Sequence, residues 1–580
     1  MINKDVQGNL FNRFFSSRSS FLRGSFFLSL PAVVFLALFF FYPLARILGL
    51  TLDSSVLTSD NFLLTWRVLS FTFYQAFLST LLTFLLGLPA AYLFARFDFR
   101  GKSLLRAMTA IPFMLPTVVV ASSFNALFGS RGWLSFLPST LLRASFPLSS
   151  FPQLSPFALI LLAHVFYNTT IVIRIVGNAL TQLDPRLEAA ARTLGANPLK
   201  VWTQVILPLL RVPLLAAGLL VFLFDFTSFG VILLLGGAKF ATLEVEIYIQ
   251  ALQLLNLPLA ALLSLIQLLC TLTFSILYSR LSAQMLVPAA PRPSTARRPK
   301  TLLEKIYTAS FIFLLSSFFV LPLLALPIRS ITRLEADRGQ RGDVQYGLTA
   351  SYYSELFVNR RGSIFYVPPA EAARNSLTYA GATVLLSLAL GFPLASALAR
   401  PGRIERILDP LLMLPLGASA VTLGLGFIVT FNRPLFSSHF SLLSSPIIIP
   451  LAHAIIALPF VVRALQPAIA SIPERLRHAA ATLGASPWRV WQTVDWPILS
   501  RAILSAATFA FTVSLGEFGA ATLLARPDFP TLPVAIARFL AQPGGLNYGQ
   551  AMAMSTILMG VTLLGILSIE KLRLPGAGEF

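Results

Sequence analysis

Long runs of apolar residues recur along the chain, and short segments between them carry most of its charge. The runs 25–44 and 257–277 are almost wholly apolar, and each is long enough to cross about 30 Å of hydrocarbon as a helix. A window of about 19 residues predicts about twelve spans. They lie near 25–48, 69–95, 105–128, 157–180, 212–236, 257–279, 306–328, 375–399, 407–430, 446–466, 501–525 and 549–569.

The pattern repeats at the midpoint of the chain. His164 and His453 are 289 positions apart, and the same offset relates a series of further pairs. These are Arg174 and Arg463, Gly195 and Gly484, Pro208 and Pro497, Phe229 and Phe518, and Thr242 and Thr531. With six spans in each half, both halves enter the membrane from the same side, so we expect an all-α integral membrane fold of two parallel six-helix repeats.

This layout predicts five segments. They are a cytoplasmic N-terminal tail (1–24), a first lobe (25–282), a Pro-, Ala- and Arg-rich cytoplasmic linker (283–304), a second lobe (305–570) and a C-terminal tail (571–580). The first apolar run is too long for a signal peptide and lacks a small-residue cleavage site, so we expect a retained anchor.

Composition agrees with a membrane protein. Only 12% of the residues are charged and 56% are hydrophobic, whereas a soluble protein carries about 25% charged residues. The net charge of +21 comes from basic loops on one side of the spans, which predicts that this side and both termini are cytoplasmic. No basic stripe suggests nucleic acid as a partner, and the single Cys270 excludes an intrachain disulfide and a multi-cysteine metal site.

The cytoplasmic loop after the fourth span of each half predicts a helical hairpin. The Ala-rich residues 187–194 favour a helix, Gly195 can end it in a left-handed conformation, and Asn197 and Pro198 suit the start of a second helix. The apolar residues that follow, Val201, Trp202 and Val205, then share one face that is available to a partner, and Pro208 ends the segment. The alternative is that this face packs on the chain's own loops.

The loop resembles the EAA loop of ABC importer permeases. The resemblance implies a type I ABC importer permease fold, and two separate ATPase subunits that each dock on one such loop. The implied coupling residues are Glu188, Ala189, Ala190, Gly195, Ala196, Trp202 and Pro208 in the first copy and Ala479, Gly484, Ala485, Trp491 and Pro497 in the second. The second copy departs from the pattern at Arg477 and His478, which puts the usual salt bridge to the ATPase in doubt there.

The fused twelve-span form is similar to the thiamine and ferric-iron permeases of this superfamily, and the stretches 226–237 and 242–248 resemble the thiamine members most. The resemblance implies a permease of the bacterial inner membrane that receives its substrate from an external solute-binding protein. Gly101-Lys-Ser imitates the end of a P-loop, but position 96 is Arg and no strand precedes it, so ATP must be bound by a partner. We expect no catalytic residue, metal or cofactor. The competing hypotheses are a gradient-driven secondary transporter and a membrane-embedded enzyme.

Two acidic residues fall within predicted spans. Asp225 lies in span five, and Glu517 in span eleven corresponds to Ser228, one helical turn from Asp225. Buried charge in a membrane usually faces an aqueous path or a polar partner. Asp225, Ser228 and Glu517 are therefore candidates for the pathway of a cationic substrate, or for structural hydrogen bonds between helices. His164 and His453 could pair at a metal, but packing within the helices is the simpler interpretation.

Overall fold

The computed structural model describes residues 27–52, 58–134, 154–285, 296–334, 347–358, 367–399, 409, 411–412, 414–432 and 442–572. The predicted N-terminal tail, residues 286–295 of the linker and residues 573–580 of the C-terminal tail lie outside this part of the chain. The described chain is almost entirely helical, and its strands are the short β1 (Thr332–Arg333) and β2 (Gly347–Leu348), which pair antiparallel.

Nine helices in the described ranges are long and apolar enough to cross a membrane, and there are ten if one bent pair counts as a single span. The bent pair is α4 (Lys102–Met114) and α5 (Thr117–Phe128), which meet at 109°. Pro116 precedes α5, and a proline disfavours helix at the residue before it. At the ninth predicted span, α18 (Ala420–Phe431) has only 12 residues, so a total of twelve spans stays a prediction.

The chain divides into two compact units, which are described separately. Unit 2 contains residues 50–370 and 532–563. Its long helices are α3 (Ser59–Arg96), α7 (Pro156–Gln182), α10 (Leu207–Phe226), α13 (Leu257–Met285) and α14 (Leu302–Ser330). Its shorter helices are α8 (Pro185–Thr193), α9 (Pro198–Val201), α11 (Gly230–Leu235), α12 (Leu243–Tyr248), α15 (Ser351–Ser354) and α24 (Leu532–Ala541), and α25 (Gly545–Leu572) lies mostly in this unit.

Local sequence signals explain where the helices of unit 2 begin. Ser155 caps α7 by accepting a hydrogen bond from the backbone N–H of Ala158, and Pro156 occupies the first turn. Thr301 and Glu304 form a reciprocal capping box at the start of α14. The core of this unit lies where α3 and α10 pack against α7.

Unit 1 contains residues 1–49, 371–531 and 564–580. Its helices are Phe27–Leu50, α16 (Pro369–Leu398), α18, α19 (Ile448–Ala470), α20 (Glu474–Thr482), α21 (Pro487–Val490), α22 (Trp496–Gly516) and α23 (Gly519–Leu524). The N-terminal helix Phe27–Leu50 packs against α18 and α19 through a cluster of buried aromatic and aliphatic side chains. α19 packs along α22 in the same way that α7 packs along α10 in unit 2.

The fifth span differs from its prediction at both ends. Residues 198–226 form one continuous apolar helix, so Pro208 does not end the segment as expected. The π-helical turn η3 (Trp202–Ile206) lies within this helix, just before Pro208, and the N–H of Leu207 donates to the carbonyl of Trp202. Because this turn is wider than an α-helical one, the helix passes through a proline that has no N–H to donate. The equivalent turn η9 (Trp491–Asp495) precedes Pro497.

Candidate functional site

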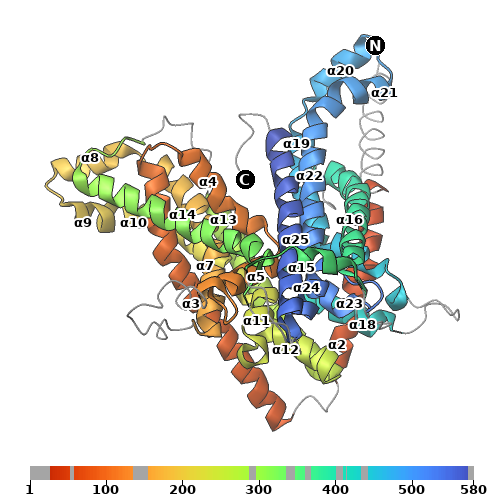
Figure 1. Cartoon of the computed structure of the whole chain (residues 1–580). Helices are drawn as coiled ribbons and strands as arrows, with labels where there is room; N and C mark the ends of the chain where they lie inside the picture. Colours follow the sequence, from red (N-terminus) through yellow and green to blue (C-terminus); the bar gives the residue numbers. More distant parts are fainter. Residues whose placement is uncertain are drawn as a thin grey trace, which may run out of the picture. The chain divides into compact units, whose positions relative to one another are not determined.

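The first predicted loop is a hairpin of α8 and α9 at the N-terminal end of α10 (Figure 1). Gly195 has φ +82°. The N–H groups of Gly195 and Ala196 donate to the carbonyls of Arg192 and Ala191, both at 3.0 Å, which is the Schellman pattern that closes a helix C-terminus. Asn197 then caps α9 through the N–H of Lys200 at 2.8 Å. The predicted roles of Gly195 and Asn197 in the local backbone are confirmed.

The second loop has the same geometry in the hairpin of α20 and α21, at the end of α22 (Figure 1). Gly484 has φ +83°, and the N–H groups of Gly484 and Ala485 donate to the carbonyls of Ala481 and Ala480, again at 3.0 Å. Ser486 takes the place of Asn197 and accepts a hydrogen bond from the N–H of Arg489. The two segments share the run Thr-Leu-Gly-Ala at 193–196 and 482–485, and they build one backbone motif twice.

The predicted apolar face of the first hairpin is only partly covered by the chain itself. Val201 is 2% exposed and joins the core cluster of unit 2, while the Trp202 ring lies 5.5 Å from that of Tyr92. The chain's own helices therefore cover Val201, whereas Trp202 stays 36% exposed. The hairpins also expose Leu194 (87%) and Leu483 (89%) immediately before the left-handed glycines.

Those two leucines are 289 positions apart, so they are equivalent in the repeat. Sequence reasoning missed them because the helical pattern was assigned to the residues after the turn. The signal that would have found them is their place at the end of an Ala-rich helix, where the Schellman turn directs the side chain away from the protein. Leu199 (72%) and its equivalent Trp488 (62%) are also exposed.

Each hairpin is also held to its own unit by an ion pair. Glu188 in α8 pairs with Arg96 at the end of α3. In the second hairpin the equivalent residue is Arg477, which lies 2.8 Å from Asp495 and 3.3 Å from Glu474. The sign of the charge is reversed, yet the position is ion-paired within the chain in both copies. Ala189, Ala190 and Ala479 lie on the exposed sides of these helices, as do Pro208 and Pro497.

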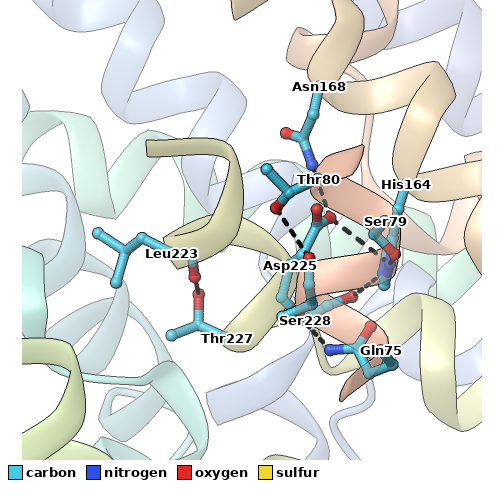
Figure 2. Close-up of polar contacts among 10 residues, drawn as sticks. Gln75, Ser79, Thr80, His164, Asn168, Leu223, Asp225, Thr227 and Ser228 are labelled. Carbon is cyan, nitrogen blue, oxygen red and sulfur yellow. Dashed lines mark hydrogen bonds and ion pairs between the residues drawn. The ribbon is translucent and has the colours of Figure 1, made fainter. Parts of the chain in front are cut away.

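Asp225 lies in a buried polar cluster within unit 2 (Figure 2). Its carboxylate accepts a hydrogen bond from Asn168 at 2.7 Å and lies 3.5 Å from Nδ1 of His164. Nδ1 of His164 is also 3.0 Å from the hydroxyl of Ser79, and its Nε2 is 2.8 Å from the hydroxyl of Ser228. We call Ser79, His164, Asn168, Asp225 and Ser228 the first polar cluster. It joins α3, α7 and the break that follows α10.

Glu517 lies in a second polar cluster, within unit 1, formed by Thr383, His453, Ser514 and Glu517. Nδ1 of His453 is 2.8 Å from the hydroxyl of Ser514, which in turn lies 3.2 Å from that of Thr383. Nε2 of His453 lies 3.2 Å from the Glu517 carboxylate. The same carboxylate accepts hydrogen bonds from the N–H groups that begin α23, those of Ala520 at 3.0 Å and Ala521 at 2.9 Å.

Both histidines are thus hydrogen-bonded to neighbouring helices of their own unit, in agreement with the packing interpretation. In the described ranges no three His, Cys, Asp or Glu residues lie close enough to hold a metal ion. Asp225 is fully buried and Glu517 is 8% exposed. The structure therefore brings each acidic residue together with a histidine and a serine, and these contacts favour the interhelical role over direct contact with substrate.

Comparison with known proteins gives a family for the chain. Residues 83–287 match the family model described as "Binding-protein-dependent transport system inner membrane component". The thiamine transport system permease protein ThiP of Escherichia coli is 28% identical over 526 residues, which cover 89% of this chain and 90% of that protein.

Two further relatives match over similar lengths. ThiP of Haemophilus influenzae is 27% identical over 92% of this chain and 93% of its own length. The probable ABC transporter permease protein y4fN of Sinorhizobium fredii is 24% identical over 86% of each chain. The family match over residues 83–287, the similarity to permeases over nearly the whole chain and the membrane helices together indicate a multi-pass membrane permease of the binding-protein-dependent ABC importer type.

Proposed function

We propose that the chain is the fused two-lobed permease of a thiamine importer. The similarity to thiamine permeases over about nine-tenths of the chain supports this substrate. In this proposal a solute-binding protein delivers thiamine on the outer side, and both termini lie in the cytoplasm.

We further propose that two ATPase subunits dock on the two hairpins, one on α8–α9 and one on α20–α21. The observation that carries this proposal is the duplicated backbone motif. Two equivalent helices end at two left-handed glycines, and an exposed leucine precedes each glycine. An exposed apolar side chain on a hairpin that its own unit holds rigidly is suited to fill a pocket on a partner. The chain would then bind no ATP itself and would transmit closure of the ATPases to its two lobes.

The docking proposal is tested with Leu194→Asp, Leu483→Asp and the double variant in the co-expressed importer. Each single variant is expected to weaken co-purification of the ATPase, and the double variant to abolish it, while the amount of permease in the membrane stays constant. Leu348→Asp is the matched control, because Leu348 is 84% exposed and lies outside both hairpins. Full retention of the ATPase by the double variant would contradict docking at these leucines.

The substrate is tested in proteoliposomes that contain the assembled importer and its solute-binding protein. ATP-dependent accumulation of radiolabelled thiamine is expected, without accumulation of radioactive ferric iron under the same conditions. A secondary transporter, the remaining alternative, would instead accumulate substrate from an imposed ion gradient without ATPase subunits. Uptake under that condition alone would overturn the importer mechanism.

A further inference from the structure

Both polar clusters contain a histidine with an acid and a serine from the next helix, and the places of the acid and the serine are exchanged between them. Asn168 of the first cluster has no counterpart, because the equivalent position 457 is alanine. His164 and His453 are equivalent, 289 positions apart. Each lies beside two positions, three residues apart, in the fifth span of its own half. In the first cluster the acid is at the earlier position (Asp225) and the hydroxyl at the later one (Ser228). In the second cluster the hydroxyl comes first (Ser514) and the acid second (Glu517).

The contacts follow the exchange. Nδ1 of each histidine faces the earlier position and Nε2 the later one. Nδ1 of His164 lies 3.5 Å from the Asp225 carboxylate, with the Ser79 hydroxyl closer at 3.0 Å, and Nδ1 of His453 lies 2.8 Å from the Ser514 hydroxyl. Nε2 meets Ser228 at 2.8 Å in the first cluster and Glu517 at 3.2 Å in the second. Each histidine therefore has the acid and the serine of the following helix beside it in opposite order, and His164 also contacts Ser79.

Each cluster lies at a break in the fifth span of its half, which is span five in the first half and span eleven in the second. α10 ends at Phe226 and α11 begins at Gly230, while α22 ends at Gly516 and α23 begins at Gly519. A helix break in the membrane leaves backbone N–H and C=O groups without intrahelical partners, and these must be satisfied by other groups. Glu517 does so directly for α23, and Gln75 donates to the carbonyl of Asp225 at 2.8 Å in the first unit.

We infer that each repeat needs one carboxylate beside its histidine as a positioning residue. The carboxylate can stand at either of two positions, 225 or 228 in the first half and 514 or 517 in the second. The carboxylate and the histidine fix the interrupted end of span five to the neighbouring helices, so that this end moves with its unit during transport. The acid acts through the histidine and the backbone, and does not contact the substrate. This inference rests on the proposed importer function and extends it, since it concerns the residues on which the maximal rate of transport depends.

The test moves the acid within one cluster. In the first cluster we compare Asp225→Ser, the exchanged pair Asp225→Ser with Ser228→Glu, and a displaced pair, Asp225→Ser with Thr227→Glu. Thr227 is the control position because its hydroxyl bonds to the carbonyl of Leu223 and no described contact joins it to His164. The displaced pair carries the same added glutamate one residue away from the required site.

Thiamine uptake and ATP hydrolysis are measured in proteoliposomes of the assembled importer. Asp225→Ser is expected to lower the maximal rate about tenfold or more, which is the factor that corresponds to the free energy of one hydrogen bond to a charged group. The KM for the loaded binding protein is expected to stay unchanged. The exchanged pair is expected to recover most of the rate, and the displaced pair none. Recovery has a structural basis, because a glutamate at 228 supplies α11 with the cap that Glu517 gives α23.

Three results would overturn the inference. They are an exchanged pair as slow as Asp225→Ser, equal recovery by the displaced pair, and a raised KM with an unchanged maximal rate, which would mean contact with the substrate. If the larger glutamate at 228 prevents folding, the reciprocal exchange Glu517→Ser with Ser514→Asp, compared with Glu517→Ser alone, decides the question. ATP hydrolysis keeps the test separate from the proposed function, because it reports the variants even if wild-type protein does not transport thiamine.

Discussion

Replacing Gly195 and Gly484 by alanine isolates the contribution of the hairpin backbone to ATPase docking. Both glycines have φ near +80°, and a Cβ added at either would meet no atom of the chain within 4 Å. The cost is therefore the conformational one alone, about 1–2 kcal/mol for a non-glycine residue in the left-handed region. We expect the fraction of each hairpin in the docking geometry to fall about five- to thirtyfold.

Asparagine at the same positions separates backbone strain from contact with the partner. Asparagine enters the left-handed region more readily than alanine although its side chain is larger. If the glycine is needed for its conformation, the affinity for the ATPase should fall in the order glycine, asparagine, alanine. Affinity is measured by titrating purified ATPase subunit onto the permease in nanodiscs, with circular dichroism as the check that the helices are retained.

The opposite order would refute this reasoning. A permease in which asparagine weakens binding more than alanine would show that the partner packs against the glycine and excludes any side chain by size. Equal and unimpaired binding of all variants would show that the left-handed turn does not matter for docking.

Three further predictions concern stability and the anchoring of the first hairpin. A Cβ at Gly87 would lie 2.8 Å from the Cβ of Val172, so Gly87→Ala is expected to destabilise the protein by about 1–3 kcal/mol in a thermal melt in detergent. Thr301→Ala removes one half of the capping box of α14 and should cost about 1 kcal/mol, whereas Thr301→Ser should leave the melting temperature nearly unchanged. Glu188→Gln breaks the ion pair with Arg96 and should increase proteolysis of the hairpin in intact inverted vesicles; equal cleavage of variant and wild type would contradict an anchoring role.

The backbone of the hairpins could be predicted from the sequence because its determinants are local. A glycine, a capping residue and a proline at fixed spacing specify a helix end and a helix start almost without reference to the rest of the chain. The same holds for the repeat, since a constant offset requires no knowledge of packing. The observed φ angles and capping bonds confirm the hairpin backbone, while the layout of two six-helix repeats stays a prediction.

Predictions that depended on tertiary contacts were less successful. Val201 was expected to face a partner, and its burial depends on α3 and α7, which are distant in sequence. Pro208 was expected to end a helix, and the π-helical turn that carries the helix through it has no simple sequence signature. The sequence predicted only part of the polar clusters, namely their acids, their histidines and Ser228. The other serines and threonines were missed because such residues are common in membrane helices.

The reversed charges of the two hairpins bear on how one kind of ATPase can serve both. Glu188 and Arg477 occupy equivalent positions, and a partner that had to pair with this side chain would need sockets of opposite charge. Both side chains are instead ion-paired inside their own units, so neither charge has to be offered to a partner. What the hairpins do share is the left-handed glycine and the exposed leucine before it. Two identical ATPase subunits therefore suffice if they bind this common apolar feature, and the departure of the second loop from the acidic pattern then has no cost for docking.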